Sequence, residues 1–221
     1  MKVYDWLHKN YHYHYNPENS RNIIVAAGLF AAGKGFGCIG IDYFVRAQRF
    51  DLAAPLAEKI GDLEMAIGLY EKAKMFDEGI GLAERKGDKD KVINLYKGKI
   101  MYLKWKGKHS EGAELALKNL PKAEGAKIAI ELYKEALDFD KAANLGPIAG
   151  ISKEIIYRDG IKYYEHSNMF DEAIKLAKKI SDDKEIIRLL KKQSEYYKQL
   201  AEEERRKAEE RRILEEITAA G

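Results

Sequence analysis

Three segments of this chain contain residues whose types and spacing could support chemistry. The first, Gly28–Gly35, follows an apolar run and nearly matches a phosphate-binding P-loop. That chemistry needs Ser or Thr after the lysine to hold magnesium, but Gly35 follows Lys34. The sequence beyond it also lacks the strand–helix alternation that would build a parallel sheet. We therefore interpret the segment as a closely packed, glycine-rich helical pair, too polar at Lys34 to be a membrane span.

The second segment, residues 1–19, is rich in histidine and aromatic side chains. His8 and His12 would share one face of a helix, and with His14 they could bind a metal. No cysteine or neighbouring carboxylate cluster completes a tetrahedral ligand set, so we predict no metal and no cofactor. The alternatives are packing against the first repeat, or an aromatic surface that a partner, including exposed bases, could stack on.

The third segment, residues 89–108, carries seven lysines against the single acidic residue Asp90. Aromatic residues lie among these lysines, a combination that suits a phosphate backbone with stackable bases. The alternative is an ordinary solvated, lysine-rich face. The candidate partner-binding residues here are Lys97, Lys99, Tyr102, Lys104, Trp105 and Lys106.

The elements that would position these residues come from a fivefold internal repeat, Phe-Asp-x-small-x-x-Leu-small. Its copies start at Phe50, Phe76, His109, Phe139 and Phe170, which are 26, 33, 30 and 31 residues apart. A period near thirty indicates stacked helix-turn-helix units. Each start should open the second helix of a unit, with its Asp accepting the unpaired N–H groups at the helix end.

The repeat also predicts which side chains are buried. We expect the leucine six residues after each start to point into the stack. These leucines are Leu56, Leu82, Leu115, Leu145 and Leu176. A large residue six positions before each start should form a second buried ladder. Its members are Phe44, Tyr70, Leu103, Tyr133 and Tyr164. Glycine in Gly61-Asp62 and Gly87-Asp88 should end helices in the left-handed conformation, and Ser181-Asp182 takes the same place in the last copy.

These second-helix starts resemble those of tetratricopeptide-like repeats over roughly residues 36–182. The usual bulky residue seven positions after the start is replaced by Ala or Gly, which is more similar to the α-solenoids of coat and transport proteins. The resemblance implies a scaffold that binds peptides or other macromolecules, without choosing the ligand. In such stacks one face of each first helix lines a concave groove. The basic residues at these positions in the last three units are Lys97, Lys104, Lys127, Lys134, Arg158 and Lys162. Such a groove could take an acidic peptide, a carboxylate terminus or RNA.

The C-terminal segment, residues 183–218, is predicted to be one helix. It contains no Gly or Pro, and its Glu and Arg or Lys residues recur four apart. The apolar group around Ile186 and Leu190, which extends to Tyr197 and Leu200, should continue the seam of the last repeat. A homodimer is predicted because some apolar residues of this helix find no cover in the repeats. These residues are Leu200, Ile213, Leu214 and Ile217. The alternatives are that the segment is a frayed tail or a free arm for another partner.

We therefore expect an all-α, right-handed solenoid of about five helix-turn-helix repeats with a long C-terminal helix. Residues 1–48 would form a divergent N-terminal cap, 49–182 the repeats and 183–221 the charged helix. With one cysteine, 34% charged residues and a net charge of +3, we expect a cytoplasmic protein with a thermophile's surface. No Ser/His/Asp set or paired carboxylates stand out, which predicts a non-catalytic scaffold. An RNA- or ribosome-associated factor is the alternative.

Overall fold

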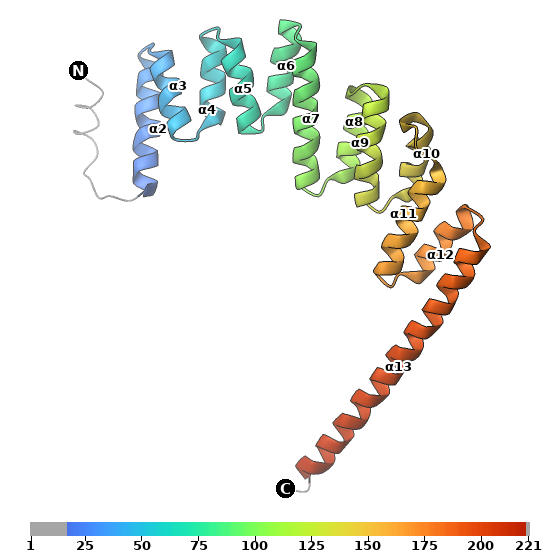
Figure 1. Ribbon diagram of the computed structural model, residues 1–221. Helices are drawn as coiled ribbons and strands as arrows, with labels where there is room; N and C mark the ends of the chain where they lie inside the picture. The colour runs from blue at the N-terminus through green and yellow to red at the C-terminus, as the bar shows by residue number, and fades with distance from the viewer. Residues whose placement is uncertain (1–16, 220–221) are drawn as a thin grey trace. The chain divides into compact units, whose positions relative to one another are not determined.

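The computed structural model describes residues 17–219, with side chains for residues 21–216 and 218, and this part of the chain is all-α (Figure 1). The helices are α2 (Pro17–Gly33), α3 (Gly37–Arg46), α4 (Phe50–Lys59), α5 (Leu63–Ala73), α6 (Phe76–Lys86), α7 (Lys89–Trp105), α8 (His109–Asn119), α9 (Lys122–Glu135), α10 (Phe139–Ala149), α11 (Lys153–His166), α12 (Phe170–Lys179) and α13 (Asp183–Ala219). None of these helices is long and apolar enough to cross a membrane.

Consecutive helices pack as pairs, in two compact units that meet in sequence at Pro121 and Lys122. The first unit contains α2 and the pairs α3/α4, α5/α6 and α7/α8, and the second contains α9/α10, α11/α12 and α13. Every predicted start opens the second helix of a pair: α4, α6, α8, α10 and α12 begin at the five repeat starts. The all-α repeat fold and its single long C-terminal helix are confirmed.

The turn at Pro121, between the two units, differs from other turns between repeats. Gly61, Gly87 and Ser181 adopt positive φ, as predicted, and each is followed by an Asp. Between α8 and α9 the chain instead passes through Leu120, which is extended at ψ 162°, and then Pro121. The capped turn that joins one repeat tightly to the next is missing at this joint.

The aspartates of the repeat starts do not cap their helices as predicted. The residues at the N-cap positions of α4 and α6 are Arg49 and Met75, and neither accepts a capping hydrogen bond from its side chain. Side-chain caps come instead from residues that precede a helix: the aspartates of inter-repeat turns, Asp138 before α10 and Ser152 before α11. Asp62 Oδ1 accepts from Met65 N at 3.0 Å, and Asp88 caps α7 in the same way. The reason is geometric, because a side chain must precede the first helical residue to reach the unpaired N–H groups.

Two of the start aspartates bind the following helix instead. Asp77 on α6 accepts from Lys99 Nζ on α7 at 2.6 Å, and Asp171 on α12 accepts from Gln193 Nε2 on α13 at 2.9 Å. Both pairs are 22 residues apart. In these two copies the second residue of the motif therefore links its helix pair to the following helix, whereas Asp51 pairs with Arg49 in its own turn.

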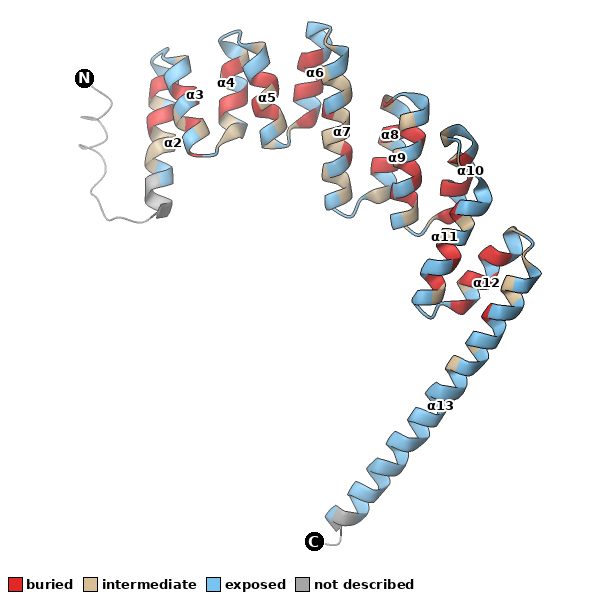
Figure 2. Ribbon diagram, in the orientation of Figure 1, coloured by how far each residue is buried: buried red, intermediate tan, exposed pale blue. Residues whose placement is uncertain are grey.

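Burial follows the facing sides of the helices within each unit, but it differs from the predicted register (Figure 2). Of the five repeat leucines, Leu82 and Leu176 are buried, whereas Leu56, Leu115 and Leu145 are only half-buried. The small residue after each leucine is buried in all five repeats. Helices in these pairs approach closely, so the contact line passes through the small residues and displaces the larger leucines to its edge. The upstream ladder is buried at four positions, and only Leu103 is half-buried.

The turns within the repeats all use a left-handed residue two positions before the second helix. These residues are Gln48, Lys74, Gly107, Leu137 and Asn168, with φ between 56° and 74°. Only one of them is a glycine. Leu137, at φ 60°, is the least suited, because a branched side chain crowds the following carbonyl in this conformation.

Replacing Leu137 by Gly is therefore expected to raise the free energy of unfolding by about 1 kcal/mol, although a 36% exposed side chain is lost. The hydrogen bond that Leu137 accepts from the Tyr164 hydroxyl uses the backbone carbonyl and is kept. Urea denaturation followed by circular dichroism measures the change. The matched control is Leu117→Gly, at similar exposure but inside α8, which should be destabilising by about 1 kcal/mol.

Candidate functional site

The most exposed large apolar side chains of the described repeats lie on α7. Trp105 is 75% and Met101 62% exposed, and they stand four residues apart on one face of the helix. Lys106 Nζ lies 4.8 Å from the centroid of the Trp105 ring and 5.6 Å from that of Tyr102. We name Met101, Tyr102, Trp105 and Lys106 the α7 ridge.

The α7 ridge packs on the core of the first unit. The Tyr102 ring lies 6.0 Å from both the Trp105 ring and the Phe76 ring of α6. Gly98 makes this possible, because a Cβ there would lie 2.9 Å from Phe76 Cε1. The helix itself has 17 residues, against 10 to 14 in the other first helices of the pairs. Because α7 is longer, the neighbouring helices do not cover the ridge.

Several lysines of residues 89–108 are partly neutralised by ion pairs. Lys91 pairs with Glu71 at 3.1 Å, and Lys99 pairs with Asp77. Lys108 pairs with Glu111 at 3.0 Å. Lys97 and Lys104 are half-buried and also interact with neighbouring groups. The surface is therefore an apolar and aromatic centre with a lysine rim, rather than an unbroken track of cations.

The other predicted basic residues lie in the second unit. Lys127 and Lys162 are exposed, on α9 and α11. Lys134 is held between Glu131 at 3.3 Å and Asp159 at 3.1 Å. Arg158 likewise pairs with two carboxylates, those of Glu154 and Asp182. Each is placed on a first helix as predicted, but a common surface with residues 89–108 stays a prediction, because that segment belongs to the first unit.

The glycine-rich segment is helical, as the sequence indicated. Gly28 lies in α2 where a Cβ would come within 2.7 Å of the Phe44 ring, and a Cβ on Gly40 of α3 would lie 3.2 Å from the Gly28 carbonyl oxygen. These glycines serve close helix packing. Within the described side chains, no group of three His, Cys, Asp or Glu residues could hold a metal ion. His8, His12 and His14 lie outside the described residues.

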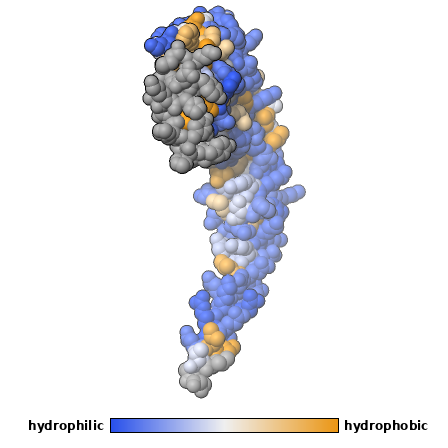
Figure 3. Space-filling view, turned by 90° about the vertical axis from the view of Figure 1, so that its left-hand side faces the viewer, coloured by the Kyte–Doolittle hydropathy of each residue, from blue (hydrophilic) through white to orange (hydrophobic). Residues whose placement is uncertain are grey.

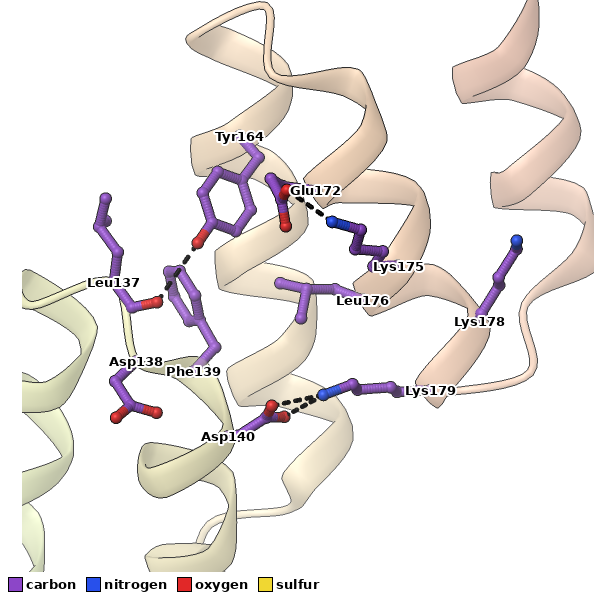
Figure 4. Close-up of a pocket in the computed structure, with 10 residues that line it drawn as sticks. All are labelled: Leu137, Asp138, Phe139, Asp140, Tyr164, Glu172, Lys175, Leu176, Lys178 and Lys179. Atoms are coloured by element: carbon purple, nitrogen blue, oxygen red, sulfur yellow. Dashed lines mark hydrogen bonds and ion pairs between the residues drawn. The ribbon is translucent and has the colours of Figure 1, made fainter.

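A furrow in the second unit lies between α10, α11 and α12 (Figure 4). Four of its charged groups form two ion pairs: Asp140 pairs with Lys179 and accepts from the Tyr157 hydroxyl at 3.0 Å, and Glu172 pairs with Lys175 at 2.7 Å. Lys179 and Tyr157 hold the pKa of Asp140 below its ordinary value. A carboxylate kept ionised in this way is a poor proton acceptor, so the furrow is better suited to joining helices than to acid–base chemistry.

The first turns of α13 are fixed to α11 by a half-buried carboxylate. Glu165 binds Arg188 through both of its oxygens, with Nη1 at 2.7 Å, and it also accepts from Lys192. The bond to Arg188, helped by Lys192, lowers the pKa of Glu165 to about 2. Glu165 therefore stabilises the fold above about pH 4.5, and this contribution is lost as the pH falls toward 2.

The substitution Glu165→Gln should accordingly cost about 1–2 kcal/mol near neutral pH, since the two partners are half exposed and screened. The difference from the native chain should shrink steadily below pH 4.5. Urea denaturation across this pH range tests it, with exposed Glu195→Gln on α13 as control. A difference independent of pH would contradict this role of Glu165.

The apolar residues of α13 fall into two classes. Leu189 is fully buried, and the Tyr196 ring lies 5.7 Å from that of Phe170, so these two continue the seam of the last repeat. The expectation that Leu190, Tyr197 and Leu200 do so is wrong, because they are 40–53% exposed. The predicted register is one residue off, which turns a helical side chain by about 100°.

At the far end of α13, Ile213 is 49% and Leu214 62% exposed, so the described residues leave them uncovered as predicted. The side chain of Ile217 lies outside the described part.

Sequence reasoning missed Met101 on α7, although the 33-residue spacing before the third repeat start signals the longer helix that carries it.

Comparison with known proteins does not assign the chain to a family. No protein-family model matches the chain, and no curated protein matches it at a significant level.

Proposed function

We propose that this chain is a non-catalytic intracellular scaffold of the tetratricopeptide-like or coat-protein-like kind. It binds a macromolecular partner through its helical repeats and associates with itself through α13. The observation that carries the proposal is the α7 ridge, where Trp105 and Met101 are exposed on a helix whose other side belongs to the core. Large apolar side chains with a charged rim are the usual anchors of protein interfaces.

An RNA- or ribosome-associated function is the second candidate. It is supported by the exposed Trp105 ring beside Lys106, since a base can stack on an aromatic ring whose neighbour reaches phosphate. The ion pairs of Lys91, Lys99 and Lys108 favour a protein partner, because an RNA backbone would have to replace these carboxylates.

The test captures partners of the full chain from a lysate of its own cells, with and without nuclease. Trp105→Ala and Lys106→Glu should each reduce capture of the same partner, while Met65→Ala and Lys59→Glu on other exposed helix positions should not. A partner lost on nuclease treatment, with steep salt dependence, would assign the RNA function. Equal capture by all variants would reject the α7 ridge as the binding surface.

A further inference from the structure

Two uncovered apolar sites on this chain have rims of opposite charge. The first is the α7 ridge. The helix neighbours of Met101, three and four residues away, are Lys97, Gly98, Lys104 and Trp105. With Lys106 over the Trp105 ring, this apolar pair is bordered by lysines. Residues 89–108 together carry seven lysines and one aspartate, a balance of +6.

The second site is the end of α13, which we name the α13 tip, residues 209–217. The helix neighbours of Ile213 are Glu209, Glu210, Glu216 and Ile217. Residues 209–217 contain four glutamates and two arginines, a balance of −2. Figure 3 shows a hydrophobic patch at this end of the helix, separated by a hydrophilic stretch from the rest.

The stretch before the tip needs no partner of its own. Residues 201–212 contain no apolar side chain larger than alanine. They are supported by four-apart ion pairs, Glu203 with Lys207 at 2.6 Å and Arg206 with Glu210 at 3.8 Å. Such pairs stabilise an exposed helix without packing. The helix therefore presents its tip at a distance from the α12 seam, since 37 residues extend about 55 Å.

We propose that the α13 tip of one copy docks on the α7 ridge of a second copy. The inference rests on the self-association in the proposed function and names the surfaces that make it. Ile213 and Leu214 would cover Met101 and Trp105, and the glutamate rim would face the lysine rim. Each copy has one tip and one ridge, so the contact is head-to-tail and can close into a ring or continue as a chain.

Charge favours this contact over symmetric pairing of two α13 helices. Two tips placed together would bring glutamates 209, 210 and 216 of both copies face to face. Pairing along the whole helix would have to bury the charged stretch 201–212, which costs desolvation. The tip–ridge contact is small and its charges are exposed, so it should be weak and should weaken further with salt.

The experiment is sedimentation velocity of the full chain from low to several hundred micromolar. Two charge reversals are compared with the native chain: Lys104→Glu with Lys106→Glu in the lysine rim of the ridge, and Glu209→Lys with Glu216→Lys on the tip. Controls with the same charge change are Lys59→Glu with Lys118→Glu, and Glu195→Lys with Glu202→Lys, all exposed. Circular dichroism checks that each variant is folded.

We expect the native chain and both controls to associate as concentration rises, and each reversal alone to stay monomeric. An equimolar mixture of the two reversals should associate again, because the new lysines of one tip then face the new glutamates beside the other ridge. Loss of association by the tip reversal but not by the ridge reversal would overturn the head-to-tail contact in favour of α13 pairing. A native chain that stays monomeric throughout would reject self-association altogether, and partner capture by the α7 ridge would remain a separate result.

Discussion

Replacing Gly146 by alanine should destabilise the second unit by about 3 kcal/mol, although alanine is the residue that most repeats have at this position. In α10 a Cβ on residue 146 would lie 2.5 Å from the backbone carbonyl oxygen of Ile151. A backbone atom cannot turn aside as a side chain can. The carbonyl of Gly146 also accepts the Ile151 N–H at 2.8 Å, so moving the turn breaks this bond as well.

The matched control is Gly68→Ala in α5, where a Cβ would meet no atom within 4 Å. That change should stabilise by about 0.5–1 kcal/mol, because alanine favours the helix. Urea denaturation followed by circular dichroism measures both. Equal effects of the two substitutions would show that the turn after α10 accommodates a side chain at residue 146.

Leu82→Ala should cost about 3 kcal/mol, as expected for a leucine that is 1% exposed in the core of the first unit. Leu56 holds the same repeat position one unit earlier but is half-buried, so Leu56→Ala should cost about 1–2 kcal/mol. The order follows from the apolar area that each side chain removes from water. Denaturant midpoints of the two variants test it.

An equal loss in the free energy of unfolding for both variants would show that this repeat position contributes equally to stability in both repeats. A larger loss for Leu56 would mean that the cavity left at residue 82 collapses, whereas the one at residue 56 does not.

The features proposed for function lie where the repeat is least regular. The start at His109 follows the previous one by 33 residues, and the helix before it, α7, is the longest first helix of the described repeats. A longer helix extends past neighbours that cannot cover its end, which leaves Met101 and Trp105 exposed. Side chains at the regular positions of a repeat pack against neighbouring helices, so a partner has to bind where the repeat is irregular.

The sequence by itself determined where the second helices of the repeats begin. The recurring motif marks the second helices, and all five begin at their repeat starts, while a glycine or serine before an aspartate acts locally through backbone conformation. It also determined the single helix after Asp183, because charge pairs four residues apart need no tertiary partner.

The tertiary structure decided which of two neighbouring residues is buried. A helix turns by about 100° per residue, so a small change in how closely two helices approach selects the alanine instead of the leucine, or Leu189 instead of Leu190. It also decided that Asp77 and Asp171 join repeats instead of capping helices, and that Gly146 admits no side chain. These outcomes depend on atoms 5 to 22 residues away, and a local pattern carries no information about them.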